Sequence, residues 1–154
     1  MKYQFKLQSL LKYRTFLKEK TQLEVAMILG NIQTLNQKRR KLIVDMEKIL
    51  EKLQFLLAEG IPASEYQISM SYVNDLKNQV RKVEQKIEKS NNDLEISRKK
   101  LVDRMVEVKK LERLSEKEFD CFKKSQKTKE MKSNDETYSI HFSTKNQYSI
   151  ESGH

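Results

Sequence analysis

Apolar residues along residues 25–56 follow a seven-residue rhythm. They recur at alternating intervals of three and four positions, and only Arg39 interrupts the series of Val25, Ile28, Ile32, Leu35, Leu42, Met46, Ile49, Leu53 and Leu56. Because an α-helix presents nearly the same face every seven residues, this spacing places a narrow apolar stripe on one side of a long helix. Such a stripe predicts a partner helix.

A matching stripe begins after a short break. Every seventh residue is apolar in the series Tyr66, Val73, Val80, Ile87, Leu94, Leu101 and Val108, and the companion positions are Ser69, Leu76, Val83, Ser90, Ser97, Arg104 and Leu111. Serine allows two backbones to approach closely but buries less apolar area than leucine. We therefore expect a second helix in the same chain, whose side of the seam is packed less tightly than that of the first helix.

The break between the stripes has the residues of a turn. Gly60 suits a helix C-cap, and Pro62 pushes the residue before it out of helical geometry. Ser64 and Gln67 fit a capping box that would start the next helix. A turn this short favours antiparallel neighbours. The expected fold is all-α: a long antiparallel two-helix coiled-coil hairpin.

The expected domain boundaries follow from these signals. The hairpin covers residues 1–142, with a helix at 3–58, a turn at 59–64 and a helix at 65–130. Residues 143–154 lose the apolar rhythm, so we expect a frayed or disordered tail there. Near the N-terminus, Leu17, Thr21, Val25 and Ile28 include two successive steps of four, which predicts a stutter that locally unwinds the supercoil.

Composition supports long helices and argues against a membrane span. The chain has 154 residues with three glycines, one proline and no tryptophan. No stretch approaches the roughly 20 consecutive apolar residues of a transmembrane helix. The N-terminal segment has charges scattered through it and lacks the apolar block of a signal peptide. We expect a cytoplasmic protein, in which Cys121 has no disulfide partner within the chain.

No residue pattern indicates catalysis. His141 and His154 lie in the weakly patterned tail without carboxylates or cysteine at ligand spacing, and no phosphate-binding loop is present. The sequence thus predicts no catalytic residue, no cofactor and no metal site. Arg39 and Arg104 occupy seam positions, where we expect each to extend outward to solvent or to pair with a carboxylate of the opposite helix.

Charge is unevenly distributed along the chain. Residues 2–20 carry six bases against one acid, residues 98–113 carry seven bases against three acids, and residues 53–76 carry three acids and no base. Basic helices can bind phosphates, but along the second predicted helix the bases alternate with acids, as on an ordinary coiled-coil surface. Aromatic residues interleave with the N-terminal bases, which favours a protein partner, and we expect no nucleic acid.

Five apolar residues near the predicted turn lie off the seam: Phe55, Leu57, Ile68, Met70 and Tyr72. They could plug the end of the hairpin around the turn. They could also form a partner-binding site, since they cluster on a segment without bases. The sequence leaves both alternatives open.

The order of several weak motifs resembles the FliJ family of flagellar type III export proteins. The N-terminal motif is Tyr3-x-Phe5-x-Leu7-x-x-Leu10-Leu11-x-x-Arg14. It is followed by Arg98-x-x-Leu101 and by Lys109-x-Leu111-Glu112-x-Leu114-x-Glu116-Lys117. The ending Glu130-x-Lys132-x-x-Asp135-Glu136, before Phe142, is similar to the closing segment of the family. The resemblance covers roughly residues 3–142.

The resemblance implies an antiparallel coiled coil similar to the stalk subunit of rotary ATPases. Proteins of the family insert into the pore of the hexameric flagellar export ATPase, FliI, connect it to the export gate protein FlhA, and bind export chaperones. The resemblance places ATPase-binding residues at the family's motif positions: Phe5, Leu7, Leu10, Leu11, Arg14, Leu111, Glu112 and Leu114. The gate or another partner would use the five residues near the turn. The protein would be peripheral to the membrane through its partners.

Two alternatives remain at this stage. A generic coiled-coil scaffold or chaperone without an ATPase partner would carry the same heptads. A helix kinked at Pro62 could also pair with a second chain as a parallel dimer. The short turn gives the internal partner an effective concentration on the order of millimolar or more, so we expect a monomer when the protein is free.

Overall fold

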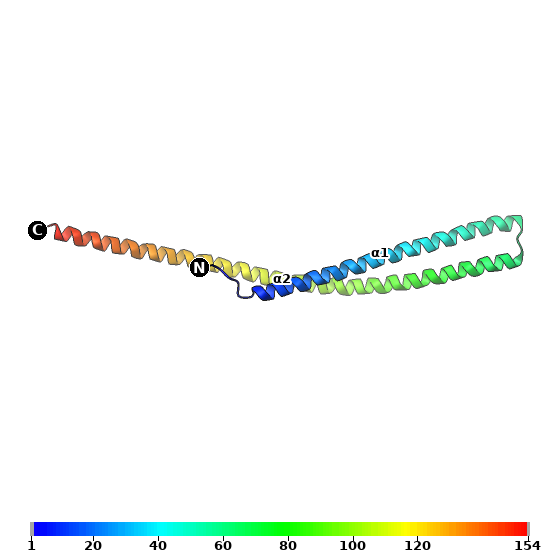
Figure 1. The fold of residues 1–154 in the computed structure, drawn as a ribbon, viewed down its shortest axis with the longest axis horizontal. Helices are drawn as coiled ribbons and strands as arrows, with labels where there is room; N and C mark the ends of the chain where they lie inside the picture. Colours follow the sequence, from blue (N-terminus) through cyan, green and yellow to red (C-terminus); the bar gives the residue numbers. More distant parts are fainter. Residues whose placement is uncertain (1, 154) are drawn as a thin grey trace. The chain divides into compact units, whose positions relative to one another are not determined.

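The computed structural model describes residues 2–153, which form two helices (Figure 1). Helix α1 spans Gln8–Glu59 and helix α2 spans Ala63–Glu151. The chain divides into two compact units. The hairpin unit comprises residues 15–105, and the terminal unit comprises residues 2–14 together with residues 106–153. The expected all-α fold, a hairpin of two long helices packed against each other, is confirmed.

The seam of the hairpin unit consists of the residues that the heptads predicted. On α1, every residue of the apolar stripe is buried or half-buried, and on α2 the same holds for the predicted positions from Ser69 to Arg104. The most deeply buried apolar side chains of this unit are Leu53, Val73, Leu76, Val83 and Leu94. Removing such a side chain from water contributes about 1.5–3 kcal/mol, so this stripe holds the two helices together.

Tyr66 is the exception among the predicted seam residues of the hairpin unit. Its side chain is 38% exposed. Tyr66 lies in the first turn of α2, where its N–H donates to the carbonyl of Pro62 at 3.2 Å. The opposite helix ends at Glu59, so little of α1 remains to cover this ring.

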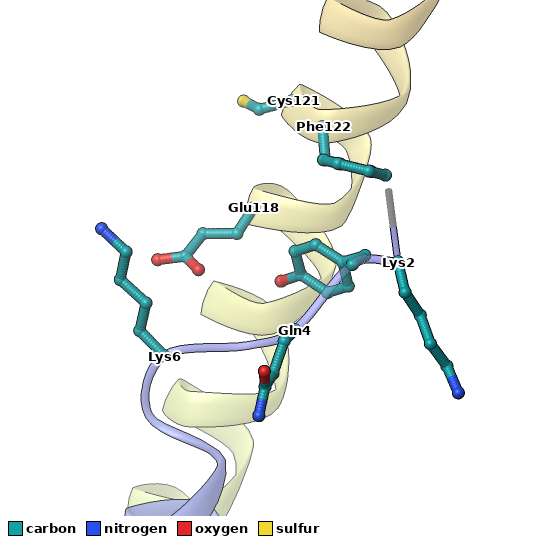
Figure 2. A pocket seen from close by; sticks show the side chains of 7 residues that line it. Lys2, Gln4, Lys6, Glu118, Cys121 and Phe122 are labelled. Atoms are coloured by element: carbon teal, nitrogen blue, oxygen red, sulfur yellow. The ribbon is translucent and has the colours of Figure 1, made fainter.

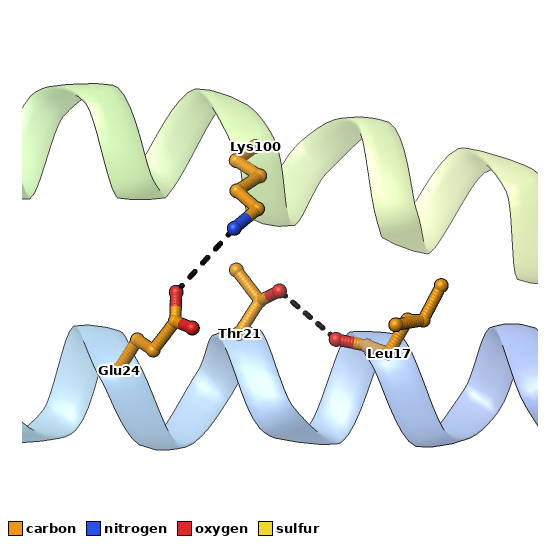
Figure 3. Close-up of polar contacts among 4 residues, drawn as sticks. All are labelled: Leu17, Thr21, Glu24 and Lys100. Carbon is orange, nitrogen blue, oxygen red and sulfur yellow. Dashed lines mark hydrogen bonds and ion pairs between the residues drawn. The ribbon is translucent and has the colours of Figure 1, made fainter.

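Polar residues take part in the seam of α1 toward its N-terminal end. Thr21 is buried, and both Leu17 and Lys18 before it are half-buried, so the step of four on which the stutter rests and the regular step of three are both present, and the stutter stays a prediction. Thr21 is only 2% exposed, and its hydroxyl donates to the carbonyl of Leu17 at 2.9 Å (Figure 3). A threonine satisfied within its own helix can therefore occupy the seam at little cost.

One ion pair crosses the hairpin beside this threonine. Lys100 Nζ lies 3.6 Å from a carboxylate oxygen of Glu24 (Figure 3). Both side chains are more than a third exposed, and pairs of this kind contribute about 0–1 kcal/mol. The ion pair therefore favours the antiparallel register of the two helices but contributes little to the free energy of unfolding.

Arg39 interrupts the buried stripe at a cost. The side chain is half-buried, and within residues 2–153 its Nε atom is buried without a hydrogen-bond partner. Neither expected arrangement accounts for this atom, since it faces neither water nor a carboxylate. A buried unsatisfied donor costs about 1–3 kcal/mol, so we infer that Arg39 weakens the seam locally.

The turn uses glycine as expected but not the capping box. Gly60 follows the last residue of α1 with φ 86°, the left-handed conformation that glycine adopts without strain. Helix α2 then begins at Ala63, directly after Pro62, whose carbonyl accepts the first helical hydrogen bond. Ser64 lies inside the helix and cannot cap it. Pro62 directly precedes the first residue of α2, a position at which a proline loses no helical hydrogen bond.

Both helices differ in extent from their predicted ranges. Helix α1 begins at Gln8 rather than at residue 3, and α2 continues past residue 130 through the segment expected to be frayed. Between residue 131 and Glu151 no proline or glycine interrupts the chain, and hydroxyls such as that of Thr137 bond to the carbonyl four residues earlier. All side chains from Lys127 to Gly153 are exposed. His154 lies outside the described residues.

Candidate partner-binding surfaces

The described part of the terminal unit starts with a non-helical segment before α1, which comprises residues 2–5 without regular secondary structure and a turn at Lys6 and Leu7. Apolar and polar residues alternate here, and successive side chains of an extended chain point to opposite sides. Phe5 is only 5% exposed and Tyr3 is half-buried, whereas Lys2, Gln4 and Lys6 are exposed. The N–H of Gln8 donates to the carbonyl of Phe5 at 3.2 Å, which joins the segment to the first turn of α1.

Tyr3 fixes this segment on α2. Its hydroxyl donates to the carbonyl of Ser115 at 3.3 Å. Its ring lies 5.2 Å from that of Phe119 and 5.4 Å from that of Phe122, both tilted, which is the preferred geometry for aromatic pairs. Lys123 Nζ lies 4.4 Å from the centre of the Phe119 ring. These contacts form an aromatic clasp, which we define as Tyr3, Phe119 and Phe122.

A groove of about 530 Å³ opens beside the clasp (Figure 2). It is lined by Lys2, Tyr3, Gln4, Lys6, Glu118, Cys121 and Phe122. Figure 2 shows Glu118 projecting from α2 on the side of the groove where Lys6 lies, so both charge signs are available there. The groove is open to solvent and therefore suits binding of a partner surface rather than chemistry that needs water excluded.

The eight residues predicted to bind an ATPase all belong to the terminal unit. The structure separates them by exposure. Leu7, Leu10, Glu112 and Leu114 are exposed, while Phe5 is buried and Leu11, Arg14 and Leu111 are half-buried. The exposed group can contact a partner directly. The buried and half-buried group is less accessible to a partner and would act on it mainly through packing within the terminal unit.

Sequence reasoning missed the clasp, although a signal was present. Tyr3, Phe5 and Leu7 alternate with Lys2, Gln4 and Lys6, a period of two that favours an extended segment over a helix. The segment was predicted as helix because Tyr3, Leu7 and Leu10 also fit a helical face. Phe119 and Phe122 had no assigned role, because their partner Tyr3 is far away in sequence.

The hairpin unit carries a second surface beside the turn. We call it the tip groove, a depression of about 340 Å³ lined by Ile49, Lys52, Leu53, Leu56, Ile68, Ser69 and Tyr72. Of the five residues predicted near the turn, it brings Ile68 and Tyr72 together. Phe55 and Leu57 are exposed and Met70 is half-buried, and none of the three lines this groove.

Carboxylates lie around the tip groove. On α2, Glu65 precedes Ile68 by three positions and Asp75 follows Tyr72 by three positions, so each acid lies on the same side of the helix as its apolar neighbour. On α1, Glu59 follows Leu56 by three positions. All three acids are exposed. An apolar groove with charged residues at its rim has the composition of a protein interface.

Neither surface indicates a metal or a membrane. Among residues 2–153, no group of three or more histidine, cysteine, aspartate or glutamate side chains could hold a metal ion. In the same part of the chain, no helix combines the length and apolar character that crossing a bilayer requires.

Comparison with known proteins gives a consistent result. The model of the family described as Flagellar FliJ protein matches residues 2–147. A curated relative, the Flagellar FliJ protein of Bacillus subtilis (strain 168), is 24% identical over 136 residues, which cover 88% of this chain and 92% of the relative. No solved structure matches the chain.

Proposed function

Because the chain belongs to the FliJ family of flagellar export proteins, which are not catalytic, we propose that it is a stalk of the flagellar type III export apparatus. Its terminal unit inserts into the ring of the hexameric export ATPase, FliI. Its hairpin unit links the ring to the export gate protein FlhA and to export chaperones. This role places it in the cytoplasm, peripheral to the membrane through its partners.

The proposed ATPase contact is supported by the exposed side chains of the terminal unit. Within the terminal unit, Leu7, Leu10 and Leu114 are exposed large apolar side chains at the family's motif positions, close in sequence to Lys6, Lys110 and Lys117. Exposed apolar anchors ringed by charge are typical of binding hot spots. The clasp holds the N-terminal segment on α2, so the unit meets the ring in a defined conformation and loses little conformational entropy on binding.

A stalk of this kind can couple a ring to a distant gate through its shape. A two-helix element presents different side chains around its circumference, so it cannot contact six identical ring subunits equally. The nucleotide state of the contacted subunits would then favour particular orientations of the stalk. The helices α1 and α2 both continue from the terminal unit into the hairpin unit, which offers a mechanical route to the gate.

The ATPase contact is tested with the purified cognate ATPase. We expect the wild-type chain to raise the ATPase rate and promote ring assembly, and the variant Leu7→Ala/Leu10→Ala/Leu114→Ala to lose most of both effects. A matched control truncates three exposed apolar residues of the hairpin unit, Leu29→Ala/Val44→Ala/Leu50→Ala, and should stimulate like wild type. Unstimulated rates with the wild-type chain would favour the scaffold or chaperone alternative.

The gate contact is tested separately at the tip groove. The variant Ile68→Ser/Tyr72→Ser should weaken binding of the cytoplasmic part of FlhA about tenfold, as expected for losing one apolar anchor worth about 1.4 kcal/mol. ATPase stimulation should not change. Full gate binding by this variant would remove the tip groove from the proposal while leaving the ATPase role intact.

A further inference from the structure

A second groove lies elsewhere in the hairpin unit. We call it the far groove, a depression of about 420 Å³ lined by Glu24, Met27, Ile28, Asp93, Ile96 and Ser97. Met27 is 75% exposed and Ile96 is 67% exposed, although both are large and apolar. The ion pair between Glu24 and Lys100 lies at its edge. The lining of the far groove thus combines uncovered apolar side chains with two acids, whereas the lining of the tip groove includes Lys52 and has its acids nearby rather than in the lining.

The two grooves occupy the same heptad positions. Ile96 and Ser97 follow Ile68 and Ser69 by four heptads, and Glu24 precedes Lys52 by the same interval. In an antiparallel pair with an unbroken seven-residue repeat, positions separated by whole heptads lie on the same face. Both grooves therefore open on one face of the hairpin unit. At about 1.5 Å per residue, they lie about 42 Å apart along it.

The face between the grooves is basic. Six exposed lysines occupy the heptad positions that flank the seam on this side: Lys38, Lys41, Lys48, Lys82, Lys86 and Lys89. Asp45 is the acid among them. Acids are added at the two ends of this face. Glu24 and Asp93 line the far groove, where Lys100 pairs with Glu24, and Glu59, Glu65 and Asp75 lie near the tip groove, whose lining includes Lys52. The face is therefore basic in the middle and mixed in charge, with more acids, at both ends.

We propose that this face binds one amphipathic helix of a partner protein, laid along the hairpin unit as a third helix. The helix places an apolar anchor in each groove, acidic residues against the central lysines, and lysine or arginine beside each anchor. Amphipathic helices commonly bind in apolar grooves through anchors at helical spacing. Two anchors on one stiff helix strengthen each other, because binding at one groove raises the effective concentration at the other.

This inference deepens the proposed partner contact at the tip groove by defining the kind of segment that binds there. It makes no use of the ATPase. Loss of ATPase stimulation and loss of third-helix binding are therefore separate outcomes, and each proposal can fail without the other.

The test uses a fluorescein-labelled synthetic helix of about 35 residues, long enough to span both grooves. It carries two leucine anchors four heptads apart, lysines beside each anchor and glutamates between them. A second peptide exchanges the central glutamates for lysines. Fluorescence anisotropy with the full chain measures both affinities. We expect the glutamate peptide to bind at least tenfold more tightly than the lysine peptide, with a preference that declines as salt is added.

Variants of the full chain locate the binding face. Met27→Ser/Ile96→Ser at the far groove and Ile68→Ser/Tyr72→Ser at the tip groove should each weaken binding of the glutamate peptide about tenfold. The matched control Leu29→Ser/Leu50→Ser, at exposed apolar positions that line neither groove, should bind like wild type. All these side chains are exposed, so thermal unfolding followed by circular dichroism should confirm that the variants remain folded.

Charge exchange provides an independent check. Lys41→Glu/Lys48→Glu/Lys86→Glu should reverse the preference, so that the lysine peptide binds more tightly than the glutamate peptide. Equal binding of the two peptides to wild type, or equal weakening by the control variant, would overturn the proposal. It would also be overturned if sedimentation equilibrium showed a dimer of the wild-type chain that the variants Met27→Ser/Ile96→Ser and Ile68→Ser/Tyr72→Ser abolish, because a second copy would then cover this face.

Discussion

The hairpin unit and the terminal unit contain the same two helices but are stabilised differently. In the hairpin unit, each helix buries a heptad stripe against the other, and the contacts repeat along the seam. In the terminal unit, the heptad stripe of α2 ends with the buried Val108 and the half-buried Leu111, and the N-terminal segment adds one aromatic clasp. From Lys127 on, every described side chain is exposed. Helical periodicity alone therefore does not tell which part of a long helix has a partner.

Substitutions in the seam of the hairpin unit should have the largest effect on stability. Leu53→Ala removes a side chain that is 4% exposed and should lower the free energy of unfolding by about 2–5 kcal/mol. Leu50→Ala, on the same helix but exposed, should cost less than about 1 kcal/mol. Urea unfolding followed by circular dichroism measures both. Equal losses would mean that the heptad seam does not dominate stability.

The clasp should have a smaller and local effect. Tyr3→Ala removes two ring contacts and a hydrogen bond, which together contribute about 1–3 kcal/mol to holding the N-terminal segment on α2. Hydrogen exchange at Gln8 and at residues 115–122 should accelerate, while exchange in the hairpin unit stays unchanged. Tyr3→Phe keeps the ring and should show only the loss of the bond to Ser115. Uniform acceleration across both units would contradict the division into two units.

Replacing Arg39 should raise the stability of the hairpin unit rather than lower it. Arg39→Leu restores the apolar stripe and removes the unsatisfied Nε, so the hairpin unit should become more stable by about 1–2 kcal/mol. Arg40→Leu, at the exposed neighbouring position, should change stability by less than about 0.5 kcal/mol and serves as the control. A loss of stability in Arg39→Leu would indicate that the guanidinium makes compensating contacts.

The exposed C-terminal end of α2 should contribute least to the free energy of unfolding. Truncation after Glu130 removes residues without packing partners and should change the free energy of unfolding by less than about 0.5 kcal/mol. Amides of residues 131–151 should exchange much faster than those of residues 80–101, because helices without tertiary packing are marginal in water. Strong protection at residues 131–151 would show that this end packs against a partner, including a second copy of the chain.

The amino-acid sequence was enough to predict the two helices, the turn at Gly60 and the seam residues of the hairpin unit, because an apolar stripe with a seven-residue repeat is removed from water only where it faces another such stripe. It also indicated the family through the order of its motifs. The tertiary structure was needed to show that Lys18 and Thr21 take part in the seam, since polar residues interrupt the apolar pattern. It was also needed to find the clasp and the two grooves, because each joins residues that are distant in sequence, whereas the face that the grooves share follows from their heptad positions.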